Sequence, residues 1–229
     1  MRVFLIVPLF LLFMQNAMAQ GRSVSGGDIR FRPIYMRDVF PNSMQPKGKA
    51  GIQGGVFVYD QWLMASLTLL DGRIADSVYI KLNAYNNCLH FMDENGEERQ
   101  ATIRVKRVLI IDENTLWHNT VYLTGFPGNP NAFYQMVYDG PKLQILKKVT
   151  VILQETKVLG EEDKRSLLQE EEYFFTANGV LYKPGKQAES LSSVFGDKKD
   201  EMVRFILSNE LNCKRKADME KVAEYFNGL

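Results

Sequence analysis

Hydrophobic and polar residues alternate along the segment from Ser77 to Asp112, the element around which the rest of the chain is organised. Val78, Ile80 and Leu82 alternate with tyrosine, lysine and asparagine. This period of two is typical of a strand with one buried face. Two turns rich in Asn, Gly and acidic residues interrupt the segment. The pattern therefore predicts three antiparallel strands joined by two hairpin turns.

Further strands are expected on both sides of this segment. Residues 56–59 and 62–70 are predicted as the first two, and 101–111 is the longest strand candidate. A charged connection facing solvent is expected at 155–172, where acidic residues cluster. Asn178-Gly179 gives the strongest hairpin signal, because both residues accept positive φ. The remaining strands are expected at residues 116–124, 132–138, 142–154, 173–175 and 180–182.

Two helices are expected at the C-terminal end, where apolar residues recur every three or four positions. Helices this short are not stable alone, so their apolar faces must dock on the sheet or on a partner. The predicted fold class is mainly β (α+β). It is an antiparallel β-meander, either an open curved sheet or a barrel, with two short C-terminal helices. The apolar faces comprise Met202, Val203, Ile206 and Leu207, then Met219, Val222, Ala223 and Phe226.

The first nineteen residues have the pattern of a secretory signal peptide. Arg2 is followed by an apolar run over residues 3–13 and by the small-residue motif Ala17-Met18-Ala19. This order predicts export and cleavage between Ala19 and Gln20. A membrane anchor is the alternative, but the apolar run has about half the length that spans a bilayer. No cysteine precedes Cys88, which excludes lipid attachment at the signal junction.

The remaining sequence divides into three parts. Residues 20–50 are expected to form an extended N-terminal arm, 51–195 an antiparallel β domain, and 196–229 a two-helix tail docked on the sheet. Within the arm, Arg30, Arg32 and Arg37 suggest a clamp for an anionic ligand. A solvated leader without a ligand is the favoured interpretation.

Composition limits the class of protein. The chain has 229 residues, of which 45% are hydrophobic, enough to bury a core. Removing Arg2 with the signal peptide leaves 28 − 1 = 27 basic residues against 27 acidic ones. A chain with no net charge has no strong field to attract nucleic acid. Binding to nucleic acid is therefore not expected, even though Lys214-Arg215-Lys216 lies between the two predicted helices.

Two cysteines remain in the exported chain, Cys88 and Cys213. A disulfide between them would join the C-terminal tail to the central hairpin in an oxidising compartment. The alternative is two separate buried thiols that act as small hydrophobic groups. The sequence leaves both open, because only geometry decides between them.

No motif in the sequence assigns a catalytic residue, a cofactor or a metal ligand. His90 and His118 have no second ligand at metal spacing. Residues 93–98 resemble a calcium loop, but strands flank them and a hairpin turn is favoured. The loop GFPGNPN at 125–131 lacks the Lys-Ser/Thr of a phosphate loop. It remains a candidate recognition loop, because loops on rigid sheets often carry binding.

Several of these motifs recur together in one protein group. They include Tyr59 and Trp62, the strand 78–83, Leu89-His90-Phe91, the hairpin 133–140, and an ending of the form N-x-L-N, D-M, Y-F-N. In this order the chain, from Gly55 onward, resembles a group of uncharacterised exported proteins of Gram-negative bacteria. The resemblance implies a periplasmic or envelope-associated domain, and it supplies no catalytic residues.

The functional expectation is a non-enzymatic binding or structural domain in the cell envelope. Its partner would be an envelope protein or another cell-surface component. It is not expected to be an integral membrane protein, and its oligomeric state is left open. The alternatives are a lipocalin-like carrier of a small apolar ligand and a carbohydrate-active hydrolase with a carboxylate pair.

Overall fold

The computed structural model describes residues 23–24, 31–33, 52–93, 95–102, 104–156, 164–185 and 188–229. The predicted signal peptide and most of the predicted arm lie outside these residues. The strands are β1 (Ser23–Val24), β2 (Phe31–Pro33), β3 (Ile52–Gln53), β4 (Leu63–Leu69), β5 (Ile74–Asn83), β6 (Cys88–Met92), β7 (Glu98–Ala101), β8 (Val105–Ile110), β9 (Val121–Leu123), β10 (Tyr134–Tyr138), β11 (Gln144–Thr156), β12 (Lys164–Ala177) and β13 (Val180–Tyr182). The helical elements are η2 (Ala188–Leu191), α2 (Ser192–Phe195), η3 (Gly196–Lys198), α3 (Lys199–Ser208) and α4 (Lys216–Gly228).

The strands form one mainly antiparallel sheet that does not close into a barrel. Its order is β13-β12-β11-β10-β9-β8-β4-β5-β6-β7-β2, with β1 beside β5 and β3 beside β12. The first and last strands of this order are not paired with each other. The fold class is therefore confirmed, and of the two predicted forms the structure has the open sheet.

Strands β4, β5, β6, β8 and β9 form a sheet lobe with its own core. Burial alternates along β4, so that every second side chain enters the core. We call this cluster the sheet core; its largest fully buried members are Leu67, Leu69, Ile80, Phe91, Ile110 and Tyr122.

Two predicted strands are wrong. Residues 56–59 make only an isolated bridge, between Phe57 and Asn83. The long strand expected at 101–111 is two strands: β7 pairs with β6 and β2, whereas β8 pairs with β4 and β9. The chain therefore leaves one side of the β4-β5-β6 group after β7 and joins the other side at β8.

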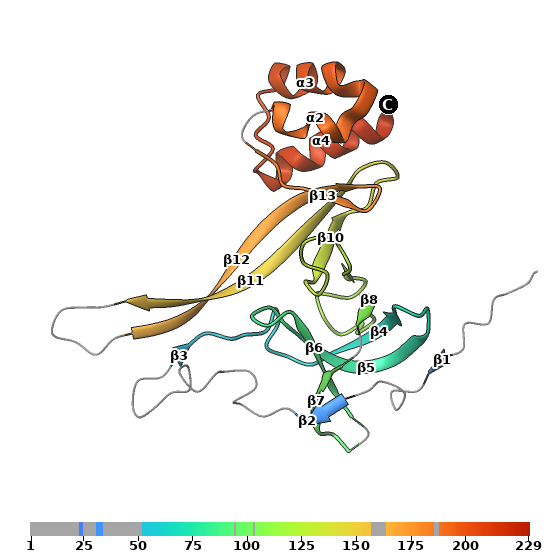
Figure 1. Ribbon diagram of the computed structural model, residues 1–229, viewed down its shortest axis with the longest axis vertical. Coiled ribbons are helices and arrows are strands. Elements are labelled where there is room, and N and C mark those ends of the chain that lie inside the picture. Colours follow the sequence, from blue (N-terminus) through green and yellow to red (C-terminus); the bar gives the residue numbers. More distant parts are fainter. Residues whose placement is uncertain are drawn as a thin grey trace, which may run out of the picture.

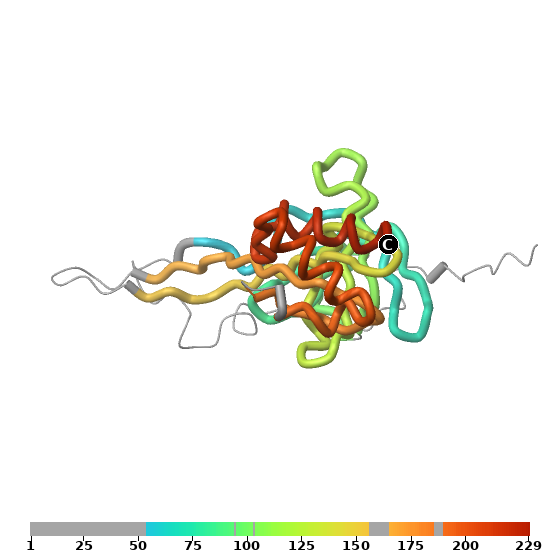
Figure 2. The backbone as a smooth tube through the Cα atoms, turned by 90° about the horizontal axis from the view of Figure 1, so that it is seen from above, coloured from blue at the N-terminus to red at the C-terminus, as the bar shows by residue number. Residues whose placement is uncertain are grey.

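The connection expected at 155–172 is also wrong over its described residues. Strands β11 and β12 pair continuously from Gln144↔Thr176 to Thr156↔Lys164, forming a long two-stranded ribbon (Figure 1). Seen from above, the ribbon extends to one side of the molecule (Figure 2). Its acidic residues remain in the strand because they find partners: Lys147 Nζ and Tyr173 Oη both donate to the Glu171 carboxylate, at 2.8 and 2.9 Å.

The helices cover the opposite end of the ribbon, at the top of Figure 1. Met202 and Ile206 of α3 and Met219, Val222 and Ala223 of α4 are buried, as the spacing predicted. Leu207 is 61% exposed, so its predicted burial is wrong. We call the cluster beneath the helices the helical core; it includes Leu143, Ile145, Phe175, Leu191, Phe195 and Cys213.

One amide attaches α4 to the turn before β11. Asn227 Oδ1 accepts hydrogen bonds from the backbone N–H groups of Lys142 and Leu143, at 2.7 and 3.0 Å. Its Nδ2 donates to the carbonyls of Leu143 and Ala223, at 2.8 and 2.7 Å. A Cβ on Gly140 would collide with this amide, which explains the glycine of the Asp139-Gly140-Pro141 turn.

Candidate functional site

An open pocket of about 240 Å³ lies beside the sheet lobe. Three connections surround it: the turn between β5 and β6, the crossing between β7 and β8, and the loop before β10. We call it the polar pocket; it is lined by Asn86, Asn87, Cys88, Leu89, Gln100, Ala101, Thr102, Arg104, Val105, Thr124, Pro130, Asn131 and Phe133.

The turn after β5 is held by a buried asparagine. Asn83 Oδ1 accepts hydrogen bonds from the backbone N–H groups of Tyr85 and Asn86, both at 3.0 Å. Asn87 has a φ of 51°, a left-handed conformation that asparagine tolerates well. The short polar residues of the sequence therefore fix the turn and place Asn86 and Asn87 at the pocket.

The loop at 125–131 is held by its own contacts. The N–H of Gly125 donates to the carbonyl of Pro130 at 3.0 Å. Phe126 is buried and meets the Tyr134 ring edge-on, with 5.1 Å between ring centroids. Because the loop is anchored in this way, Pro130 and Asn131 line the pocket. The loop at 125–131 and the Asn-rich turn after β5 (residues 83–87) thus meet at one site. No local sequence pattern connects these two segments.

The lining of the polar pocket is rich in neutral hydrogen-bonding groups. Asn, Gln and Thr side chains dominate it, and Arg104 supplies a positive charge. None of the lining residues is a carboxylate. Within the described residues, no ion pair involves Arg104. Its guanidinium is therefore available to an acidic group entering from solvent.

At one wall of the pocket, a thiol, an imidazole and a carboxylate form a line of neighbouring side chains. Cys88 Sγ is 3.4 Å from His90 Nε2, and His90 Nδ1 is 2.7 Å from Glu98 Oε1. The His90 side chain is fully buried, whereas that of Glu98 is 41% exposed. Phe57 meets the imidazole edge-on, at 5.1 Å between ring centroids. We call this group the Cys88–His90–Glu98 chain.

Strand geometry assembles this chain. Residues two apart on a strand share a face, so Cys88 and His90 point the same way from β6. His90 is opposite Gln100 on β7, and Glu98 is the diagonal neighbour on the same face. In the sequence alone, neither histidine has a partner at a recognisable spacing. One sequence signal could have revealed the Cys88–His90–Glu98 chain: a Cys-x-His pair in a strand, followed across a hairpin by Glu.

Burial dominates the electrostatics of His90. It lowers the pKa of the imidazole, because desolvation disfavours the charged form, and Glu98 opposes this effect. Lys81, opposite His90 on β5, lowers the pKa further. A neutral His90 that donates from Nδ1 to Glu98 leaves Nε2 as an acceptor facing the Cys88 sulfur.

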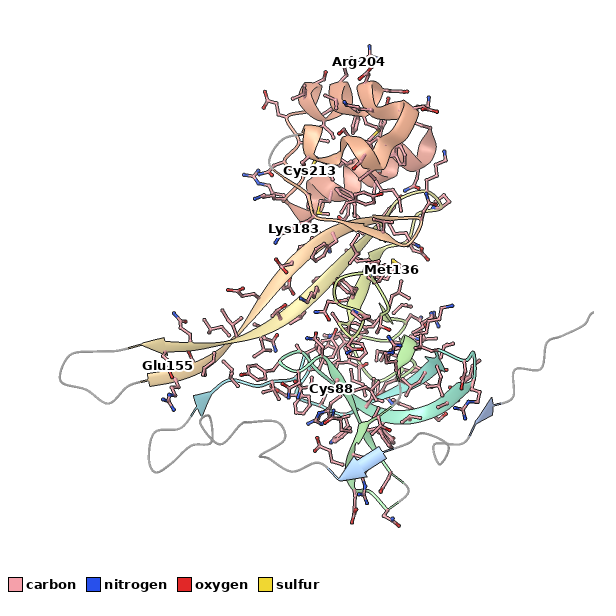
Figure 3. The ribbon with its side chains drawn as sticks, in the orientation of Figure 1. Cys88, Met136, Glu155, Lys183, Arg204 and Cys213 are labelled. Carbon is pink, nitrogen blue, oxygen red and sulfur yellow. The ribbon has the colours of Figure 1, made fainter. Side chains whose placement is uncertain are left out.

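The two cysteines are not joined. Both are thiols, and Cys213 is buried in the helical core. Figure 3 shows Cys88 in the sheet lobe and Cys213 at the helical end. Of the two alternatives left open by the sequence, the structure has separate thiols. Burial, together with the negative charge of Asp218, raises the pKa of Cys213 to about 11.

The other candidates from the sequence have structural roles. Asp93 Oδ1 accepts hydrogen bonds from the N–H groups of Asn95 and Glu97, both at 2.9 Å, as expected for a hairpin turn rather than a calcium loop. Within the described part of the chain, no three His, Cys, Asp or Glu residues form a group suited to a metal. His118 lies in an exposed turn, and Lys214-Arg215-Lys216 precede and begin α4.

A second hollow, of about 310 Å³, lies on the helical end. Phe205 and Tyr225 stack in it, with 3.9 Å between ring centroids and 2° between ring planes. Lys221 and Glu224 complete a mixed lining of apolar and charged groups. Its lining has no cysteine and no histidine of the kind found beside the polar pocket.

The molecule is thus an open antiparallel sheet with a polar pocket on one lobe and a helical cap on the other. No helix in the described ranges has the length and apolar character needed to cross a membrane. No protein-family model, no curated protein and no solved structure matches this chain. The resemblance to exported proteins of Gram-negative bacteria therefore stays a prediction.

Proposed function

We propose that this chain is an exported protein of the cell envelope that acts by binding a cell-surface component in the polar pocket. The observation that carries the proposal is the meeting of two ordered loops at a lining of amides, hydroxyls and one arginine. Such groups orient a polar ligand by hydrogen bonds, and loops on a rigid sheet are a common place for binding.

The chemistry of the lining favours a hydroxyl-rich ligand with one acidic group. Amide side chains both donate and accept, which matches the hydroxyl groups of a sugar. The Arg104 guanidinium matches a carboxylate, to which it can donate two parallel hydrogen bonds. At about 240 Å³ the pocket is smaller than the roughly 300–1,000 Å³ of sites for drug-sized ligands. The ligand we propose is therefore a single acidic sugar unit of a cell-surface polymer.

The two alternative functions receive less support. A carrier of apolar ligands needs an apolar interior, but the core face of this open sheet is filled by side chains such as Leu67, Ile80 and Phe91. A glycoside hydrolase needs two carboxyl groups facing one cleft. The lining of the polar pocket contributes none.

Titration of the mature protein with glucuronate and with glucose tests the binding proposal. We expect calorimetry or NMR shifts to show binding of glucuronate, with shifts at Asn87 and Asn131. Arg104→Gln should weaken this binding on the order of tenfold or more, because a charge-assisted hydrogen bond contributes about 1.5–3 kcal/mol. Arg204→Gln, on the helical end, is the matched control and should change nothing. Equal binding by both variants, or no binding of glucuronate, would overturn the proposal.

Export is tested separately. N-terminal sequencing of the protein recovered from the cell envelope should begin at Gln20. An intact Met1 on the recovered protein would contradict the predicted localisation.

A further inference from the structure

The Cys88 thiol differs from an ordinary buried cysteine in what surrounds it. It lines the polar pocket, and the nearest ring nitrogen of His90 lies 3.4 Å behind it. The imidazole is oriented by Glu98, at 2.7 Å from its other nitrogen. A nucleophile, a base within reach of its proton, and a group that orients the base are therefore present in one line.

The simpler alternative is a polar network that only stabilises the hairpin of β6 and β7. Two observations favour reactivity over this alternative. Cys88, at one end of the network, lines a pocket open to solvent, whereas a purely structural network has no need of access. His90 is also fully buried, and burying an imidazole costs free energy that an apolar side chain at this position would avoid.

We propose that Cys88 is a modification site that reacts with small disulfides carrying an acidic group, with His90 as proton acceptor and Glu98 as positioning residue. His90 Nε2 takes the thiol proton as Cys88 Sγ attacks one sulfur of the small disulfide. The Sγ–S bond forms and the S–S bond of the reagent breaks. Cys88 is oxidised to a mixed disulfide, and the released half is reduced to a thiol that receives the proton from His90.

The charges around the site determine which reagent is favoured. Among the described residues, the groups that act on His90 are Glu98 on β7, Lys81 on β5 and Cys88 itself. Arg104 lines the same pocket as Cys88 and attracts a carboxylate into it. A mixed disulfide at Cys88 would occupy part of the 240 Å³ and compete with the proposed sugar. The thiol reaction itself does not depend on the sugar proposal, because it is measured without sugar.

The reaction can be followed by intact mass on the folded mature protein. We expect dithiodipropionate at pH 7 to add one adduct, on Cys88, and Cys88→Ser to remain unmodified. Cys213 serves as the internal control, since it is buried and its thiol is held neutral. His90→Asn should slow adduct formation about a hundredfold or more, because general bases contribute roughly 10²–10⁴-fold. An unchanged rate in His90→Asn would overturn the proposal.

The pH profile separates a proton acceptor from a merely structural histidine. In the native protein the rate should already be high near pH 7, whereas in His90→Asn it should rise only at the alkaline pH at which an ordinary thiol loses its proton. The Glu98 side chain is partly exposed, so Glu98→Gln is a mild substitution. It tests the Cys88–His90–Glu98 chain even if His90→Asn fails to fold. It should lower the rate and flatten the profile. Identical profiles in Glu98→Gln and the native protein would refute the role of Glu98.

The charge preference gives an independent test. Cystamine, which carries two positive charges, should react several-fold more slowly than dithiodipropionate, and Arg104→Gln should abolish this difference. Equal rates for the two reagents in the native protein would contradict the selection by Arg104. Failure of glucuronate binding with normal adduct formation would remove the sugar proposal alone, so the two proposals fail independently.

Discussion

The sheet lobe and the helical end each contain one cysteine, and the two have opposite surroundings. Cys213 is packed in the helical core, where burial and Asp218 hold its thiol neutral. Cys88 stands between a solvent-facing pocket and the buried His90. The comparison shows that the same side chain can serve as a small hydrophobic group or as a candidate nucleophile, depending on the groups that the fold places beside it.

The buried polar residues follow the same division. Of the three buried polar residues in the described part of the chain, Asn83 and His90 support the polar pocket, and Thr176 lies on β12. Buried polar groups cost free energy unless they are hydrogen-bonded. In the sheet lobe, the buried polar residues Asn83 and His90 lie next to the polar pocket. The helical core consists mainly of apolar side chains.

Phe175→Ala should have the largest effect, because the ring is fully buried in the helical core. We expect a loss of about 3–5 kcal/mol in the free energy of unfolding, measured by urea denaturation. Hydrogen exchange should accelerate in α3 and α4 while the β4–β5 amides stay protected. Leu168→Ala on the same strand is the control, since Leu168 is 41% exposed. Equal acceleration in both regions would show that they are one cooperative unit.

Asn227→Ala should destabilise the helical end by about 2 kcal/mol, because it removes three hydrogen bonds between α4 and the turn before β11, and one within α4. Thermal and urea unfolding measure the loss. Asn209→Ala, which removes a single bond to the Phe205 carbonyl, is the matched control and should cost less. Equal losses would mean that the amide does not hold the helix to the ribbon.

Alkaline pH should weaken the helical end through Cys213. Its folded pKa, about 11, lies above the value of 9.0 for an ordinary thiol, so the unfolded chain releases its proton first. Stability is therefore full below pH 9 and is lost as the pH rises toward 11. Between pH 8 and pH 10 the loss should be about 1 kcal/mol. The pH dependence of urea unfolding should be less steep in Cys213→Ala, and an equal slope in both proteins would contradict the assignment.

Acid should weaken the sheet lobe through His90, with the smallest effect of the four because Glu98 opposes the effect of burial. Burial lowers the folded pKa of His90, so the unfolded chain binds a proton first. The stabilisation is present above pH 6.5 and is lost as the pH falls through the folded pKa. Unfolding measured at pH 7 and pH 5 should show a smaller difference in His90→Gln than in the native protein. A larger difference in the variant would mean that His90 is charged in the fold.

Local patterns predicted the elements whose signals are local. The alternation over Val78–Leu82 of β5, the Asn178-Gly179 hairpin, the stripe of α4 and most of the stripe of α3 were confirmed, whereas His90 of β6 is buried together with its two neighbours. Misassignments occurred where pairing overrides pattern. Residues 101–111 have a continuous strand pattern but pair on two sides of the β4-β5-β6 group. The acidic run at 170–172 remains in a strand because β11 supplies Lys147 as a partner.

The sequence by itself determined the class of the fold and the chemical identity of the groups that now form the site. Periodicity is a local property, because each residue's face is set by its neighbours in the strand or helix. Only the tertiary structure decided that the sheet stays open, that Cys88 and Cys213 lie apart, and that the Asn-rich turn meets the loop at 125–131. These outcomes depend on which distant strands pair, and pairing is decided by the packing of the whole sheet rather than by any one segment.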